Sequence, residues 1–266
     1  MTDHQVVLGD CLDPVTGLAS LPDKSVDHVI CDPPYEAEAH TLQRRIKRDA
    51  GASGYGGTDQ RVSVVEPLDF APITAEVRAS VARELARVCR GWVIVFCQAE
   101  AVAAWRLDLD SAGARWRRPM VWVKPDGQPC LAGDRPGIGY ESMATAWAGD
   151  GRSKWNGGGK LGVYSCVKST ANGNEHPTQK PLALMESLVR DFTDPGELVC
   201  DPFAGSGTTG VACKRLGRRF IGWEREPKYH AIAEKRIAAA REQLGLFREK
   251  APREKQAALS LPPEAE

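Results

Sequence analysis

The segment Asp32-Pro33-Pro34-Tyr35 holds the residue types best suited to chemistry. It directly follows the apolar run VDHVIC, which is typical of a strand buried on both faces of a sheet. Two consecutive prolines fix φ and lack amide donors, so the backbone carbonyls around them are held rigidly with no N–H beside them. The segment is therefore a stiff loop rich in hydrogen-bond acceptors, with a carboxylate at one end and an aromatic ring at the other.

Such a loop suits the activation of an exocyclic amine on a nucleobase. The lone pair of an amine such as N6 of adenine is delocalised into the ring, so the amine is a poor nucleophile. The Asp32 carboxylate and the Pro33 carbonyl could accept its two hydrogens and localise the lone pair. Tyr35 could stack on the base once the base has left the helix. The structural alternative is a simple turn, in which Asp32 forms the turn and Tyr35 packs.

A glycine-rich turn lies in the segment LVCDPFAGSGTTG at 198–210. Its glycines, Gly205, Gly207 and Gly210, form G-x-G-x-x-G between a predicted strand and a predicted helix, the context that gives this pattern meaning. Glu224 ends the next predicted strand, where a carboxylate can accept hydrogen bonds from ribose hydroxyls. These features fit any Rossmann-like nucleotide site, a NAD enzyme included, and a tight turn without a ligand is the alternative.

The elements that must position these residues form an α/β pattern, because short apolar runs alternate with stretches long enough for helices. We predict seven mostly parallel strands, at Gln5–Leu8, Val26–Cys31, Trp92–Cys97, Met120–Val123, Ser142–Trp147, Leu198–Cys200 and Arg219–Trp223. We predict flanking helices at Ile73–Val88, Pro181–Phe192, Gly207–Leu216 and Lys228–Leu244.

The order of these elements is permuted. A nucleotide-binding βα unit usually opens its domain, but here it starts near residue 198. The N-terminal half must then complete the sheet, which predicts that Gln5–Leu8 lies beside Arg219–Trp223.

Composition narrows the class of protein. The chain has 266 residues, 42% of them hydrophobic, with 35 basic and 35 acidic side chains, which fits one globular domain. The eight cysteines form no C-x-x-C pair, so we expect free thiols in a reducing cytoplasm and no metal site. Neither an export signal nor an apolar run of membrane-spanning length is visible, so we expect no membrane contact.

Together, the tetrad and the glycine turn resemble the amino-type (N6-adenine/N4-cytosine) DNA methyltransferases, in the group whose DPPY motif precedes the cofactor motif. The segments LGDCLD at 8–13 and HPTQKP at 176–181 are also similar to that family. The resemblance implies a Rossmann-like fold with permuted motif order and S-adenosylmethionine as the cofactor. It implies methyl transfer to the N6 amine of an adenine flipped out of double-stranded DNA. A monomer and a homodimer both stay open.

We expect one catalytic domain over 1–247, with a mobile loop at about 36–65, where the chain is basic and rich in glycine. A stretch rich in glycine and aromatic residues at about 126–175 is expected to be an irregular insert, and the resemblance implies that it is the target-recognition region. Residues 248–266 are expected to form a frayed tail.

The resemblance implies a role for several groups of residues. Those that hold and polarise the amine are Asp32, Pro33, Pro34 and Tyr35. Those at the cofactor come from both halves of the chain: Asp10, Cys11, Asp32, His176, Thr178, Lys180, Asp201, Phe203, Ala204, Gly205, Ser206, Gly207, Thr208 and Glu224. Local clusters of basic side chains can meet phosphates although the net charge is zero. We therefore assign DNA binding to Arg44, Arg45, Lys47, Arg48, Arg152, Lys154, Lys160 and Lys168.

Several rival functions stay open or are disfavoured by the same residues. The same chemistry on N4 of cytosine is the main alternative, although those enzymes more often have Ser at the position of Asp32. Protein glutamine methyltransferases begin the tetrad with Asn, and an RNA substrate is a further alternative. A non-catalytic regulator that binds S-adenosylmethionine or DNA fits poorly with an intact Asp32 and Tyr35. A NAD dehydrogenase would leave DPPY and HPTQKP unused, and we reject it.

Overall fold

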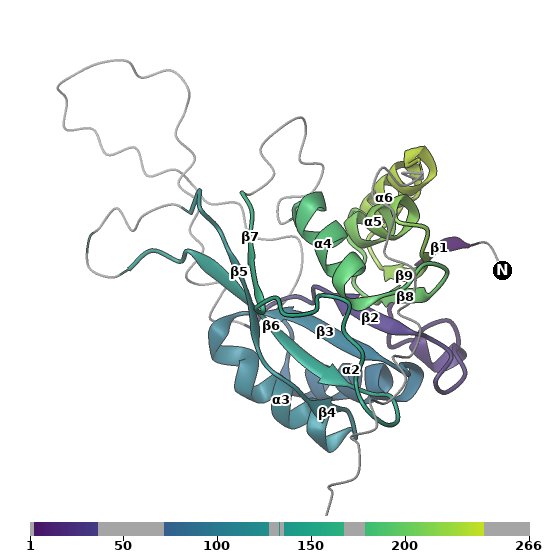
Figure 1. Cartoon of the computed structure of the whole chain (residues 1–266). Coiled ribbons are helices and arrows are strands. Elements are labelled where there is room, and N and C mark those ends of the chain that lie inside the picture. The colour runs from purple at the N-terminus through teal and green to yellow at the C-terminus, as the bar shows by residue number, and fades with distance from the viewer. Residues whose placement is uncertain (1–2, 37–71, 128–132, 134–135, 168–178, 242–266) are drawn as a thin grey trace, which may run out of the picture.

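The computed structural model describes residues 3–36, 72–127, 133, 136–167 and 179–241. Within these ranges a mixed sheet of nine strands forms the centre of the molecule (Figure 1). The strands lie in the order β1-β9-β8-β2-β3-β6-β5-β7, and β4 pairs with β6 beside this path. Their bounds are β1 His4–Leu8, β2 His28–Cys31, β3 Trp92–Cys97, β4 Arg115–Trp116, β5 Met120–Val123, β6 Tyr140–Trp147, β7 Val163–Ser165, β8 Leu198–Asp201 and β9 Arg219–Glu224.

Helices cover both faces of this sheet. In Figure 1, α2 (Ala75–Val88) and α3 (Val102–Ser111) lie on one face, and α4 (Leu182–Phe192), α5 (Thr208–Arg215) and α6 (Pro227–Ala239) lie on the other. Two short 3₁₀ helices, η1 (Leu18–Ser20) and η2 (Ala99–Ala101), complete the described elements. The expected α/β class and the flanking helices are thus confirmed.

The core explains why β2 and β3 are continuous apolar runs. Every residue of both strands is buried. Val93 and Val95 pack with α2 and α3, whereas Ile94 and Phe96 pack with α4 and α5. Because successive side chains of a strand point to opposite faces, a strand buried on both faces needs apolar residues at every position.

The predicted pairing of the N-terminal strand with the strand that ends at Glu224 is confirmed. β1 lies parallel to β9, with His4 opposite Phe220 and Leu8 opposite Glu224. β9, β8, β2 and β3 continue the parallel part of the sheet. β6 is antiparallel to β3 and to β5, so the sheet changes direction beyond β3. The carboxyl ends of β1, β9, β8 and β2 consequently meet at one edge, where open α/β sheets bind ligands.

All seven predicted strands are present, and the structure adds elements that the sequence analysis did not predict. β4 and β7 have two and three residues, too few to show a hydrophobic pattern. In α3 only Trp105 and Leu109 are buried, so its apolar stripe is narrow. The helix predicted from residue 228 ends at Ala239.

The expected domain organisation is only partly covered by the described residues. β6 lies inside the range 126–175, and its residues from Ser142 to Trp147 are buried in the main sheet. The role of this range in target recognition stays a prediction. Of the expected loop at 36–65, residues 37–65 lie outside the described ranges, as does the expected tail at 248–266. No helix in the described ranges is long and apolar enough to cross a membrane.

Candidate functional site

Asp32 is the first residue after β2 and lies at the edge where the parallel strands end. Its Oδ2 accepts a hydrogen bond from Lys180 Nζ at 2.5 Å. Its Oδ1 is buried and has no hydrogen-bond partner among the described residues. A buried acceptor without a partner is costly, and native structures rarely leave one without a functional reason. The free Oδ1 therefore marks a place where a donor of a ligand can bind.

Four charged or polar side chains form a network that begins at this carboxylate. Lys180 precedes α4, and its Nζ also lies 3.2 Å from Glu141 Oε2 in β6. The Tyr35 hydroxyl donates to the same Glu141 oxygen at 2.9 Å, and Lys124 donates to Glu141 Oε1. The ammonium of Lys180 also lies over the rings of Tyr35 and Phe96, at 5.5 Å and 5.0 Å from their centroids. Residues from both halves of the chain thus converge at this site.

Burial and neighbouring charges set the ionisation of this cluster. Burial raises the pKa of Asp32, with a smaller contribution from the negative charge of Glu141, although Lys180 opposes the shift. Burial alone would raise the pKa of Glu141, but Lys180, Lys124 and the hydrogen bonds lower it to about 2. Burial alone would lower the pKa of Lys180, but Asp32 and Glu141 raise it. Near neutral pH, Glu141 and Lys180 are therefore both charged.

The glycine turn lies at the same edge, between β8 and α5. Gly205 and Gly207 have φ of 53° and 78°, in the left-handed region that favours glycine. A Cβ on Gly205 would meet no atom closer than 4.0 Å, so this part of the turn faces open space. The Glu224 carboxylate accepts from the Gly205 amide at 2.9 Å and from the Glu226 amide at 2.8 Å. A carboxylate can accept about four hydrogen bonds, which leaves capacity for a ligand hydroxyl.

Asp201 supports the turn from within. Its carboxylate accepts from the Phe203 amide at 3.0 Å and from the Thr209 hydroxyl at 2.6 Å. Burial raises its pKa to about 7, and the nearby charges of Asp32 and Glu224 add to the shift. Because the Asp201 oxygens accept hydrogen bonds from groups of the protein itself, this residue stabilises the turn and does not present a free carboxylate to a ligand.

The other predicted cofactor residues are placed as follows. Ala204 is buried, and its amide donates to the Trp223 carbonyl at 2.8 Å. The Ser206 hydroxyl donates to Gln179 Oε1 at 3.1 Å, and Arg236 donates to the Ser206 and Thr208 hydroxyls. Asp10 is exposed and binds the amide of Leu12, and Cys11 is a buried thiol whose pKa burial raises to about 12. His176 and Thr178 lie outside the described residues.

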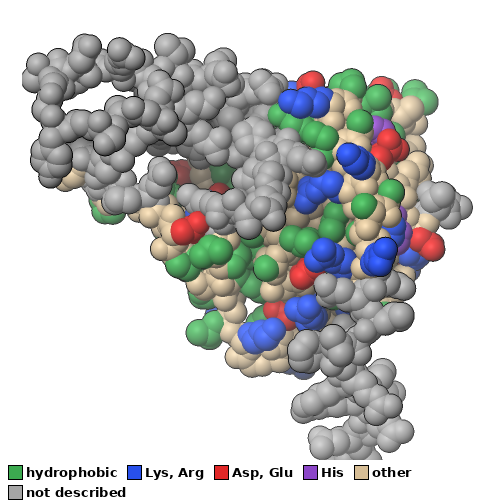
Figure 2. Space-filling model, turned by 90° about the horizontal axis from the view of Figure 1, so that it is seen from above, with side chains coloured by type: hydrophobic (Ala, Val, Ile, Leu, Met, Phe, Trp, Pro, Cys, Tyr) green, Lys and Arg blue, Asp and Glu red, His purple; other side chains and the backbone are tan. Residues whose placement is uncertain are grey.

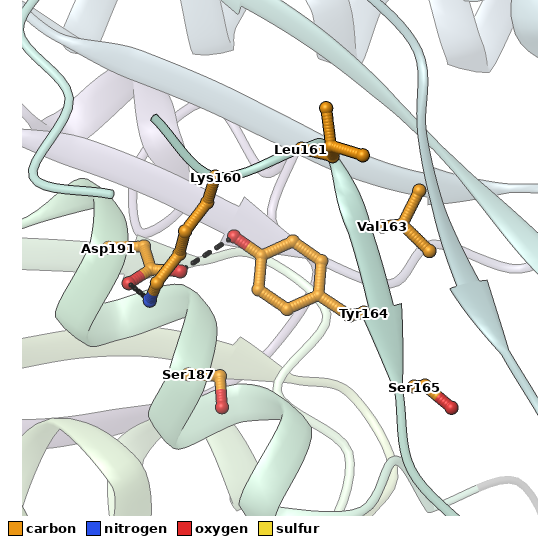
Figure 3. Close-up of a pocket in the computed structure, with 7 residues that line it drawn as sticks. All are labelled: Lys160, Leu161, Val163, Tyr164, Ser165, Ser187 and Asp191. Carbon is orange, nitrogen blue, oxygen red and sulfur yellow. Dashed lines mark hydrogen bonds and ion pairs between the residues drawn. The ribbon is translucent and has the colours of Figure 1, made fainter. Parts of the chain in front are cut away.

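The predicted DNA-binding residues separate into three groups. Arg152 and Lys154 are exposed, and no ion pair joins their side chains to another described residue. Lys160 instead donates to Asp191 at 2.7 Å, in a pocket between β7 and α4 (Figure 3). On the face in Figure 2, basic side chains alternate with acidic and hydrophobic ones, so that face carries no uniform charge in its described part. Outside the described residues lie Arg44, Arg45, Lys47, Arg48 and Lys168.

Sequence reasoning missed Glu141 and Lys124. Glu141 precedes the apolar part of β6, and Lys124 follows β5 directly. The available signal was a charged residue next to a buried strand, as at Asp32. That signal is weak, because charged residues also flank strands where they face solvent. Lys180 was predicted at the cofactor, and the structure places its ammonium on Asp32.

Comparisons with known proteins agree with these features. A family model described as DNA methylase, for the N6/N4 group, matches residues 147–235. The chain is 54% identical to the type II methyltransferase M2.DpnII of Streptococcus pneumoniae over 68 residues, which are 26% of this chain and 25% of that protein. It is 27% identical to the type II methyltransferase M.HinfI of Haemophilus influenzae over 257 residues, 88% of this chain and 68% of that protein.

Several solved structures cover most of the chain. The crystal structure of the M1.HpyAVI–SAM complex superposes with a TM-score of 0.62 at 28% identity, over 88% of this chain and 98% of that one. The PvuII DNA methyltransferase, described as cytosine-N4-specific, superposes with a TM-score of 0.66 at 19% identity, over 89% of this chain and 87% of that one. At that identity, the second likeness shows the fold alone.

Proposed function

We propose that this chain is a DNA methylase of the N6/N4 family and that it transfers a methyl group to the N6 amine of adenine in double-stranded DNA. The observation that carries the proposal is the Asp32 carboxylate, whose Oδ2 is held by Lys180 while Oδ1 is buried without a partner. An amine hydrogen is a donor of the kind that Oδ1 lacks.

The residues at the edge of the sheet fit S-adenosylmethionine as the cofactor. The turn at Gly205 opens to space, and Glu224 ends β9 with acceptor capacity for ribose hydroxyls. Phe203 is only partly buried beside this turn and can pack against the cofactor. When bound, the cofactor would supply a methyl group on a positively charged sulfur. M1.HpyAVI, a relative at 28% identity, has been solved with SAM.

The chain's own residues would act on the amine. Asp32 Oδ1 and the Pro33 carbonyl would accept its two hydrogens, so that the nitrogen lone pair points at the methyl group. The Tyr35 ring would stack on the extruded base. Transfer of that methyl group, with the C–S bonding electrons left on the sulfur, would make the amine nitrogen positively charged. That nitrogen would then release one proton, for which the adjacent Asp32 carboxylate is a suitable acceptor.

Adenine is favoured over cytosine by the acid at position 32, since cytosine-N4 enzymes more often have Ser there. The two bases would use the same fold and the same mechanism, so the product identifies the target.

The test is a methyl-transfer assay with labelled S-adenosylmethionine on unmethylated amplified DNA, followed by mass spectrometry of the nucleosides. N6-methyladenine is the expected product, whereas N4-methylcytosine would change the base and keep the mechanism. Asp32→Asn should lower kcat by about 10²-fold or more, the range measured when one preorganised polar contact to the reacting group is removed. Its affinity for S-adenosylmethionine should change little. A variant with near wild-type turnover, or wild-type protein that modifies neither base, would contradict the proposal.

A further inference from the structure

Glu141 is a partly buried acid that no step of the proposed reaction uses. It lies at the start of β6, which is antiparallel to β3 with Ser142 opposite Cys97. This pairing brings Glu141 to the carboxyl end of β3, beside the end of β2. Its two oxygens accept from Tyr35, Lys180 and Lys124. Burying a carboxylate with two lysines often gives little net stability compared with an apolar group, so stability alone is a weak reason for this cluster.

Lys180 contacts two carboxylates, and these contacts fix the position of its ammonium group. Its Nζ lies 2.5 Å from Asp32 Oδ2 and 3.2 Å from Glu141 Oε2, so it is held on one side of the Asp32 carboxylate. An ammonium has three donors and no acceptor. Without Glu141, the same ammonium could move to bridge both Asp32 oxygens, which would occupy Oδ1.

A second contact of Glu141 concerns the Tyr35 ring. Its hydroxyl donates to Glu141 Oε2 at 2.9 Å, on the oxygen that Lys180 also contacts. This hydrogen bond holds the Tyr35 ring in one orientation, next to the rigid Pro33-Pro34 segment. Lys124 in turn holds Glu141 Oε1, and its ammonium lies 4.7 Å from the centroid of the Trp122 ring. Glu141 therefore connects the ring expected to stack on the base with the cation that holds the amine acceptor.

We propose that Glu141 is a positioning residue for methyl transfer: it keeps Lys180 on Oδ2 of Asp32, leaves Oδ1 open for the amine, and orients Tyr35. This inference rests on the proposed function, since it needs an amine at Oδ1. Glu141 touches neither the base nor the cofactor in this assignment and acts through Tyr35 and Lys180.

The test compares Glu141→Gln with a matched control, Asp191→Asn. Asp191 is a buried acid that accepts from a lysine, Lys160, and from a tyrosine, Tyr164, in the pocket of Figure 3. It lies near the far end of α4 from Lys180. Glu141→Gln keeps the size of the side chain and removes its charge. We expect kcat to fall roughly 10- to 100-fold, the scale of a small misplacement of reacting groups, with unchanged S-adenosylmethionine affinity in calorimetry.

For Asp191→Asn we expect kcat within about twofold of wild type, because distant sites act independently. Tyr35→Phe removes the hydroxyl that Glu141 accepts and keeps the ring. Combined with Glu141→Gln, it should add little to the loss in kcat, because both changes break the same connection.

The outcomes separate this inference from the proposed function. If wild-type protein modifies no nucleoside, both fail. If wild-type protein is active and folded Glu141→Gln matches Asp191→Asn in kcat, only the positioning role is overturned. If Glu141→Gln does not fold, Tyr35→Phe decides: a kcat equal to that of wild type overturns the proposal, and a severalfold lower kcat with normal S-adenosylmethionine affinity supports it.

Discussion

Gly205 and Gly207 lie two residues apart in one turn, both with positive φ, yet the structure predicts different costs for replacing them by alanine. At Gly205 the new Cβ would meet nothing closer than 4.0 Å, so only the left-handed backbone is penalised. That penalty is about 1–2 kcal/mol. At Gly207 the Cβ would lie 2.9 Å from Ala233 Cβ and 3.0 Å from its Cα, inside α6. Overpacking of this kind adds about 1–3 kcal/mol.

We therefore expect losses of about 1.5 kcal/mol for Gly205→Ala and about 3.5 kcal/mol for Gly207→Ala. For a chain of this size, each kcal/mol lowers Tm by roughly 2–4 °C, which gives declines of about 3–6 °C and about 7–14 °C. Differential scanning fluorimetry measures both. For each degree of Tm lost, Gly205→Ala should lose more affinity for S-adenosylmethionine than Gly207→Ala does. The reason is that the Cβ at position 205 would enter the open side of the turn. Equal Tm values, or a less stable Gly205→Ala, would refute this account of the turn.

Two further predictions concern ionisation and DNA binding. Burial raises the pKa of Asp201 to about 7 from 3.8, so its contribution to stability is present below about pH 4 and is lost as the pH rises through 7. Asp201→Asn should accordingly flatten the decline of Tm between pH 5 and 8 in thermal melts. A parallel decline in the wild-type protein and the variant would contradict the assignment. Arg152 is exposed without an ion pair to another described residue, whereas Lys160 is paired with Asp191. Arg152→Gln should therefore lower the slope of log Kd against log salt for DNA by about 0.9, more than Lys160→Gln does, if each contact neutralises one phosphate. A larger change for Lys160→Gln in fluorescence anisotropy would reverse this order.

Much of the fold could be predicted because local patterns and global packing agree. The run WVIVFC at 92–97 is apolar at every position, and the sheet buries it on both faces. The late position of the glycine turn required the N-terminal strand to complete the sheet, and β1 does pair with β9. The sequence did not predict β7 or α3. β7 has three residues and α3 buries two side chains, so neither shows a clear hydrophobic pattern.

The amino-acid sequence by itself determined the motifs, their order and the resemblance to a family, because each motif is a contiguous run whose residue types limit its backbone and its chemistry. Only the tertiary structure decided which oxygen of Asp32 lacks a hydrogen-bond partner and which acid contacts Lys180 and Tyr35. Lys180 is 148 positions from Asp32, and Glu141 is 106 positions from Tyr35. These contacts arise because antiparallel β6 returns beside β3 and places a charged residue at the strand ends. No local pattern specifies which of many charged residues that pairing will deliver.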